Sequence, residues 1–292
     1  MQRLGAAAAE LAWWESHGTG DARTRIAKLR RGGLSYVLYQ LSKKKAIPVS
    51  ARTFWGGRFA CYLPDYFFLL LYGVLGDSAE ISLTRFIVKN LRKGDVFLDV
   101  GANCGFYSAL AARLVGPTGH VHAFEPTPAI LALLRRNTAD FTTVAVSPVA
   151  LSDENGMAPF YVSDTVRVAN SLLVAHAPQA GNAITVATRR LDDYCAEHAV
   201  TPTVIKIDVE GAEAMVLRGG KSTILSALPV ITLEIRKGVD ERPYREAMRL
   251  LLEAGYRMHR LTWQGDLQAV EPRRLLENDS QRGFENLVFT AH

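Results

Sequence analysis

The chain has 292 residues, of which 48% are hydrophobic and 22% charged, a balance typical of ordinary globular proteins. The formal net charge of +5 is uneven: residues 1–50 hold nine Lys/Arg and three Asp/Glu, whereas residues 51–292 are almost neutral. A nearly neutral main domain argues against a protein that binds nucleic acid specifically. Three widely spaced cysteines, Cys61, Cys104 and Cys195, predict neither a disulfide framework nor a metal site.

Residues 1–50 are predicted to form a basic helical extension. The first residues lack the cationic start, apolar centre and cleavage site of a secretory signal. The most apolar run, Tyr66–Gly76, has 11 residues, whereas a membrane-spanning helix needs about 20. We therefore expect a cytoplasmic protein. The cations of the extension either form a solvated helix face or contact the anionic headgroups of a membrane surface.

Residues 51–94 are predicted to form a hairpin followed by a covering helix. The aromatic-rich segment 51–64 reads as two strands turned at Gly56-Gly57. Residues 80–91 then carry apolar side chains at helical spacing and end at Lys93-Gly94, a typical helix stop. Residues 95–292 would form the main domain, and the oligomeric state stays open.

The stretch from Asp95 to Glu125 predicts a strand, a glycine loop, a helix and a second strand. The apolar run at 96–100 is typical of a parallel strand buried on both faces. Gly101 and Gly105 allow the sharp turn into the helix, and Asn103 is one of the few non-glycine residues that tolerate a positive φ. This pattern predicts a ligand-binding crevice at the carboxyl ends of parallel strands.

Two cofactor classes use such a crevice, dinucleotides and S-adenosylmethionine. A pyrophosphate needs Gly-x-Gly-x-x-Gly, but the second and third glycine positions hold Asn103 and Phe106. S-adenosylmethionine needs an acidic residue for its ammonium group and a carboxylate for its ribose hydroxyls. Asp99 fits the first role, and Glu125, at the end of the second strand, fits the second. The spacing favours S-adenosylmethionine.

A second chemical centre, residues 205–213, overlaps the fourth predicted strand at 204–209. Its sequence is Ile-Lys-Ile-Asp-Val-Glu-Gly-Ala-Glu, which places Asp208 at the carboxyl end of the strand, beside the first strand. A hydroxyl acceptor must lose its proton during methyl transfer, so Asp208 and Glu210 are the predicted catalytic residues that orient or deprotonate it. The same acids could instead cap the next helix. No metal ion is included in the predicted site.

The remaining elements complete an α/β fold. A third strand is predicted at 144–151 and a fifth at 230–235, and the strands at 256–263 and 285–290 read as a closing antiparallel pair. The prediction is a doubly wound, mostly parallel, seven-stranded sheet with an antiparallel last strand.

The ordered motifs Asp-Val-Gly-Ala-Asn-x-Gly, Phe-Glu-Pro and Ile-Lys-Ile-Asp-Val-Glu-Gly-Ala-Glu resemble the FkbM family of S-adenosylmethionine-dependent methyltransferases. The resemblance covers roughly residues 75–290. It implies a Rossmann-like, class I methyltransferase fold and an acceptor hydroxyl on a sugar, glycan or natural product. It also implies a position for Glu80 near the amino end of the cofactor, and a place for Asn170-Ser171 near the acceptor pocket. The predicted cofactor-binding residues are Glu80, Asp99, Gly101, Ala102, Asn103, Gly105, Phe106, Glu125, Pro126, Leu151, Ser152 and Asp208.

Three other functions stay open at this point. An N-methyltransferase would need no strong base, since a neutral amine acceptor has no proton to lose before attack. A non-catalytic binding module would use the basic extension as its contact surface, although the retained motif residues argue against it. An NAD-dependent oxidoreductase is disfavoured by Asn103 and Phe106.

Overall fold

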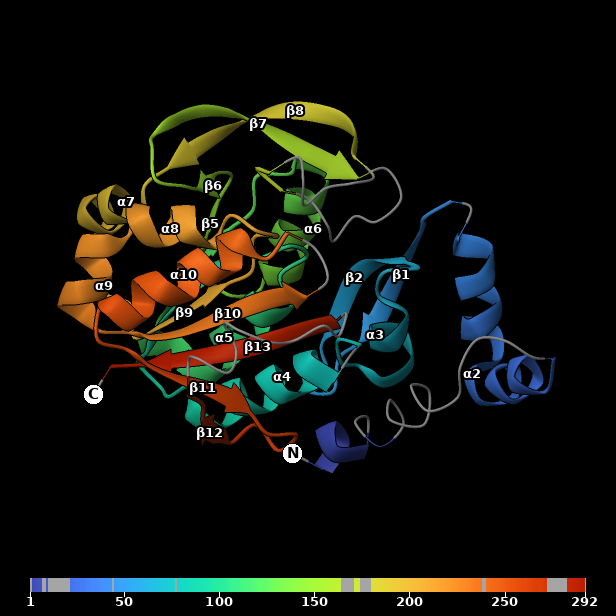
Figure 1. Ribbon diagram of the computed structural model, residues 1–292. Helices are drawn as coiled ribbons and strands as arrows, with labels where there is room; N and C mark the ends of the chain where they lie inside the picture. Colours follow the sequence, from blue (N-terminus) through green and yellow to red (C-terminus); the bar gives the residue numbers. More distant parts are fainter. Residues whose placement is uncertain are drawn as a thin grey trace. The chain divides into compact units, whose positions relative to one another are not determined.

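The computed structural model describes residues 2–6, 9, 22–43, 45–76, 78–163, 171–173, 180–237, 240–271 and 283–291. The chain divides into two compact units, Met1–Arg85 and Phe86–His292 (Figure 1). Among the described residues, no helix combines the length and the apolar character that crossing a bilayer requires. The predicted division at residues 50 and 94 stays a prediction.

The first unit is built on a β-hairpin. Strands β1 (Ile47–Arg52) and β2 (Arg58–Leu63) pair antiparallel, and helices α2 (Ala22–Ser42) and α3 (Phe67–Tyr72) accompany them. The inner face of α2 packs on this frame, since the rings of Tyr39 and Phe67 lie 4.5 Å apart between centroids. Gly33 interrupts α2 with a φ of 52°, a value that favours glycine. Helix α4 (Ser78–Asn90) begins in this unit and ends in the second.

The second unit contains an eight-stranded sheet of order β12-β11-β13-β10-β9-β3-β4-β5. Its strands are β3 (Val96–Val100), β4 (His120–Phe124), β5 (Val144–Ser147), β9 (Val204–Ile207), β10 (Val230–Lys237), β11 (Arg257–Leu261), β12 (Leu267–Ala269) and β13 (Gly283–Thr290). Strands β3, β4, β5, β9 and β10 are parallel, and β13 is inserted antiparallel between β10 and β11. The predicted α/β class and the antiparallel last strand are therefore confirmed.

The predicted count of seven strands is one too few. Strand β12 adds a three-residue antiparallel edge beside β11. All three of its residues are exposed, so it lacks the apolar pattern by which a sequence predicts a strand. A tight turn creates it, since Gly265 N donates to Thr262 O at 2.8 Å.

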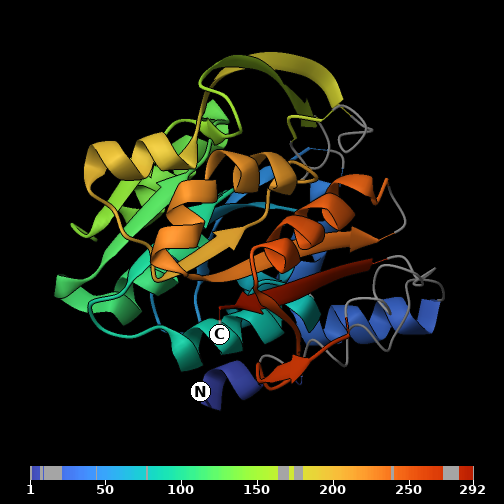
Figure 2. The ribbon, with the colours of Figure 1, turned by 60° about the vertical axis from the view of Figure 1, so that its left-hand side comes forward.

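The helices of the second unit lie on both faces of the sheet (Figures 1 and 2). They are α5 (Phe106–Val115), η1 (Gly116–Thr118), α6 (Pro128–Thr138), α7 (Leu191–His198), α8 (Glu213–Gly219), α9 (Lys221–Ala227) and α10 (Arg242–Glu253). The large apolar core joins strand residues such as Ile205 and Leu233 to helix residues such as Leu217 and Met248. The sheet is thus covered, as a near-continuously apolar parallel sheet requires.

The predicted third strand, 144–151, is in fact two strands in two sheets. Strand β5 ends at Ser147, and β6 (Ala150–Leu151) belongs to a separate sheet of order β6-β8-β7. Pro148 lies in the break, and proline has no backbone N–H with which to continue a ladder. Strands β7 (Gly156–Ser163) and β8 (Ala180–Arg189) form the long hairpin at the top of Figure 1.

Candidate active site

A cleft opens at the carboxyl ends of β3, β4 and β9. Strand order reverses between β3 and β9, because the chain proceeds to β4 and β5 on one side and to β10 on the other. Such a switch point is where open α/β sheets bind their ligands. The cleft is lined by Val100, Gly101, Asn103, Phe124, Glu125, Pro126, Val149, Ala150, Leu151, Phe160, Leu172, Asp208, Val209, Glu210 and Ala212.

The glycine loop has the backbone conformation that its sequence predicts. Gly101, Asn103 and Gly105 have φ values of 77°, 49° and 86°. A Cβ at Gly101 would lie 1.8 Å from the backbone oxygen of Asp208, and a Cβ at Gly105 would lie 2.5 Å from Leu134 Cδ1. The clash at Gly101 is with a backbone atom, so close packing alone requires that glycine, whereas at Gly105 the clash is with the end of a leucine side chain and the positive φ is the constraint.

Glu125 lies at the end of β4, buried at the wall of the cleft. Its Oε2 accepts a hydrogen bond from Asn103 N at 3.0 Å, and its Oε1 accepts one from Thr127 N at 2.8 Å. Burial raises the pKa of this carboxyl, and the two N–H donors oppose that shift. Each carboxylate oxygen has a second lone pair, so Glu125 can still accept hydrogen bonds from a vicinal diol.

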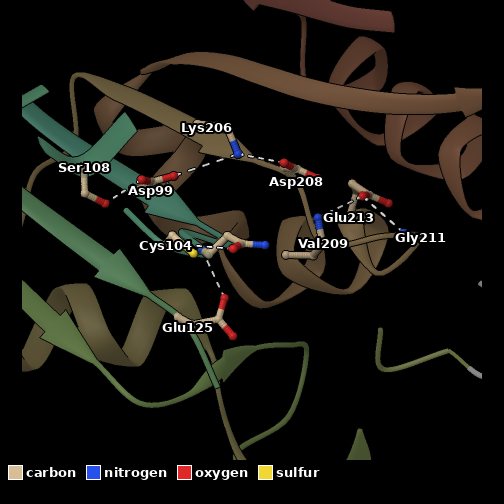
Figure 3. Close-up of polar contacts among 10 residues, drawn as sticks. Asp99, Cys104, Ser108, Glu125, Lys206, Asp208, Val209, Gly211 and Glu213 are labelled. Carbon is tan, nitrogen blue, oxygen red and sulfur yellow. Dashed lines mark hydrogen bonds and ion pairs between the residues drawn. The ribbon is translucent and has the colours of Figure 1, made fainter. Parts of the chain in front are cut away.

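A buried lysine joins the two predicted acids of β3 and β9 (Figure 3). Lys206 Nζ lies 2.9 Å from Asp208 Oδ2 and 3.9 Å from Asp99 Oδ1. Ser108 Oγ donates to Asp99 Oδ2 at 2.6 Å. Asp99 and Lys206 are register partners on adjacent parallel strands, and their side chains therefore share one face of the sheet. The sequence alone predicts no role for Lys206.

Glu210 follows β9 in a left-handed conformation, with a φ of 53°. Its Oε2 accepts from Arg236 Nη1 at 3.1 Å, and its backbone oxygen accepts from the buried hydroxyl of Ser171 at 2.6 Å. Burial and the neighbouring Asp208 raise the pKa of Glu210 to about 7, although Arg236 opposes the shift. A carboxyl with a pKa near neutrality suits general acid–base catalysis.

Glu213 supports the loop between β9 and α8 rather than the cleft. Its Oε1 accepts from Val209 N and Gly211 N, both at 3.2 Å (Figure 3). Burial raises the pKa of Glu213 to about 8, so the side chain carries a proton at neutral pH. Its ionised form is the unfavourable one inside the protein.

Glu213→Gln is expected to be more stable than the wild type at pH 9. The folded-state pKa is raised above the unfolded value, so wild-type stability falls as pH rises toward 8, by about 2–3 kcal/mol between pH 6 and 9. Gln keeps the accepting oxygen and removes this loss. Denaturant unfolding at pH 6 and pH 9 measures the change in free energy of unfolding. Glu253→Gln, at an exposed position, is the control. If the free energy of unfolding of the wild type and of Glu213→Gln changed equally with pH, the raised pKa of Glu213 would be contradicted.

Three acids lie close together, and two of them line the cleft. Asp208, Glu210 and Glu234 each place one oxygen within 4.8 Å of the others. Two side-chain cations already contact this group, Lys206 at Asp208 and Arg236 at Glu210. These internal cations balance much of the acidic charge that would attract a metal ion, and the absence of a metal from the site stays a prediction.

The structure brings seven predicted site residues together at the cleft and leaves the others out of its lining. Gly101, Asn103, Glu125, Pro126, Leu151, Asp208 and Glu210 line it. Five predicted cofactor residues are buried but do not line the cleft, namely Asp99, Ala102, Gly105, Phe106 and Ser152. Glu80 lies in the first turn of α4, in the other unit, and its cofactor contact stays a prediction. Asn170 lies outside the described residues.

Phe160 of β7 and Leu172 add an apolar wall to the cleft. Phe160 was not predicted, because its strand shows only an ordinary alternation. Leu172 belongs to the segment expected near the acceptor pocket. The backbone of Ser171 pairs with Tyr161 through two hydrogen bonds of 2.8 and 3.1 Å, which place this segment beside β7.

The sequence profile of the FkbM methyltransferase domain matches residues 99–258. The chain is 32% identical over 167 residues to the 2-O-methyltransferase NoeI of Sinorhizobium fredii, covering 52% of this chain and 68% of that protein. It is 34% identical over 158 residues to the 31-O-demethyl-FK506 methyltransferase FkbM of Streptomyces tacrolimicus, covering 44% and 60%. It is 30% identical over 178 residues to the hexuronic acid methyltransferase AglP of Haloferax volcanii, covering 60% and 69%. The chain therefore spans between 60% and 69% of these relatives' lengths.

Proposed function

The chain belongs to the FkbM family of S-adenosylmethionine-dependent methyltransferases, and we propose that it methylates a hydroxyl group of a sugar, a glycan or a natural product in the cytoplasm. The observation that carries the proposal is the cleft itself. It combines Glu125, a buried carboxylate at the end of β4 with acceptor capacity for a ribose diol, with Asp208 and Glu210, which follow β9. The relatives' names supply the acceptor class, since they describe O-methylation and methylation of a hexuronic acid.

The residues present fit the cofactor. Glu125 would hold the two ribose hydroxyls, and the apolar residues Leu151 and Phe160 would border the adenine. Asp99 does not line the cleft, so its direct contact with the ammonium group stays a prediction. When bound, S-adenosylmethionine supplies an electrophilic methyl group.

Asp208 and Glu210 would act on the acceptor. Both line the cleft, and a carboxylate at either position can accept the proton of an acceptor hydroxyl. Lys206 and Arg236 fix the orientation of these two carboxylates through hydrogen bonds of 2.9 and 3.1 Å. Orientation of the acceptor before reaction supplies part of the rate enhancement.

An N-methyltransferase remains the alternative within the same family. A neutral amine acceptor needs no base, so activity would then survive the loss of Asp208 or Glu210. Glu210, with its pKa raised to about 7, favours the hydroxyl acceptor, because a group of this kind is suited to taking up a proton near neutral pH.

Glu125→Ala is expected to weaken S-adenosylmethionine binding roughly 30–150-fold. The loss corresponds to about 2–3 kcal/mol, the value of charge-assisted hydrogen bonds to two hydroxyls. Calorimetric titration of both proteins with the cofactor measures it. Wild-type protein that binds no cofactor would refute the proposed function, whereas equal affinities would refute only the role of Glu125.

The Glu125 carboxylate also accepts two backbone N–H groups, so its removal can disturb the loop. Glu125→Gln is the matched control, because it keeps one accepting oxygen and the shape of the side chain. An intermediate loss of affinity in Glu125→Gln, with unchanged thermal unfolding, separates the ribose contact from loop support.

A further inference from the structure

The outward face of helix α2 exposes large apolar side chains. Leu34, Val37 and Leu41 follow one another at helical spacing, with exposed fractions of 74%, 40% and 61%. Ile26 and Leu29 are likewise exposed in the part of the helix that precedes Gly33. Gly33 kinks the helix between these two residues and the first three, so we call Leu34, Val37 and Leu41 alone the α2 apolar face. Single exposed apolar residues are ordinary, but a helical row of them marks an interaction surface.

The α2 apolar face is not the side by which the helix packs in its own unit. Tyr36 and Tyr39, on the opposite side of the same helix, already pack against Leu63 and Phe67 within the first unit. Helix α2 is therefore apolar on both sides. Its inward residues stabilise the first unit, and its outward residues have no such role within the described part of that unit.

The charge around the α2 apolar face identifies its partner. Residues 22–64 contain ten Lys/Arg and no Asp/Glu. The cations are Arg23, Arg25, Lys28, Arg30, Arg31, Lys43, Lys44, Lys45, Arg52 and Arg58. The side chains of Arg30, Lys43 and Lys45 are exposed. Two copies of this segment would repel each other, whereas an anionic surface attracts it.

We propose that helix α2 docks on the surface of an anionic lipid bilayer, with the α2 apolar face inserted among the headgroups and acyl chains. An exposed apolar row beside exposed cations suits contact with an anionic membrane interface, because apolar burial and attraction to anionic lipids then act together. Each cation near an anionic surface increases partitioning roughly fivefold. This proposal does not depend on the proposed enzymatic function.

Sedimentation of the full chain with vesicles tests the proposal. The wild type is expected to bind vesicles of phosphatidylcholine mixed with phosphatidylglycerol, and to bind phosphatidylcholine alone at least tenfold more weakly. Raising the salt from about 0.1 M to about 1 M shortens the Debye length from about 10 Å to about 3 Å and should release most of the bound protein. Lys43→Glu/Lys45→Glu should weaken binding at least tenfold by reversing two exposed charges.

The double variant Leu34→Glu/Leu41→Glu tests the apolar part and should also bind at least tenfold more weakly. Its matched control is Leu225→Glu/Leu228→Glu, a pair exposed by 46% and 53% in the second unit, which should bind like the wild type. Thermal unfolding establishes that each variant is folded.

Three outcomes would overturn the proposal. The wild-type protein could fail to bind anionic vesicles. The control Leu225→Glu/Leu228→Glu could also lose as much binding as Leu34→Glu/Leu41→Glu. Light scattering could also show a wild-type dimer that Leu34→Glu/Leu41→Glu dissociates, which would assign the face to a second copy of the chain.

Discussion

Asp208→Asn is expected to lower kcat by about 10²–10⁴-fold on a hydroxyl acceptor, the contribution of a positioned general base. Asn keeps the size of the side chain and a hydrogen-bonding oxygen for Lys206, but it accepts no proton. The measurement is transfer of labelled methyl from S-adenosylmethionine to a panel of sugars, uronic acids and hydroxylated metabolites. Activity within a few fold of the wild type would remove Asp208 from proton transfer and favour an amine acceptor.

The pH dependence of the variant Glu210→Gln tells whether Glu210 or Asp208 is the general base. If Glu210 is the base, wild-type kcat/KM should rise as pH increases through about 7, because the carboxyl must be ionised to accept a proton. Glu210→Gln should then lose that limb of the profile together with most of the rate. A variant that keeps the wild-type profile would leave Asp208 as the sole candidate.

Lys206→Met is expected to destabilise the fold by about 3 kcal/mol. Removing one partner of a buried ion pair typically costs about 3–5 kcal/mol, and the lower end applies because the Asp208 side chain is 25% exposed. The substitution leaves Asp99, which is 1% exposed, without the cation that opposes the upward shift of its pKa. Denaturant unfolding at neutral pH gives the free energy of unfolding.

The surface pair Lys89–Asp266, with N and O atoms 2.7 Å apart, supplies the control. Lys89→Met should cost no more than about 1 kcal/mol, since exposed ion pairs contribute little. The double variant Lys206→Met/Asp208→Asn should recover part of the loss by removing one uncompensated charge. A cost below about 1 kcal/mol for Lys206→Met would show that the buried cation is dispensable.

The predictable part of the fold is the part with a local apolar pattern. Strands β3 and β9 read directly as buried parallel strands, because both of their faces are covered and their residues are almost all apolar. The division of 144–151 between two sheets was not predicted. It depends on Pro148 and on the pairing of β6 with Thr188 and Arg189 of β8, which are distant in the chain. Periodicity within a window carries no information about such a partner.

The residues of the site likewise divide into those that the sequence predicts and those that it does not. Glu125 and Asp208 follow predictable strands, so topology alone brings them to one edge of the sheet. Phe160 reaches the cleft only because the long hairpin returns over it, and Lys206 reads in the sequence as one polar residue inside a strand. The spacing already places Asp208 on the same strand face as Lys206, but the second acidic partner, Asp99, becomes visible only when β3 and β9 lie side by side.

The tight contact between Gly101 and the Asp208 backbone changes what the glycine motif can reveal about descendants of this protein. A lineage that lost methyl transfer would still be held to glycine at position 101, since any side chain there would push the two loops apart. Retention of Gly101 is therefore no sign of activity. A silent descendant would be recognised instead by drift at Glu125 and Glu210, whose carboxylates line the cleft and which packing alone does not require to be acidic.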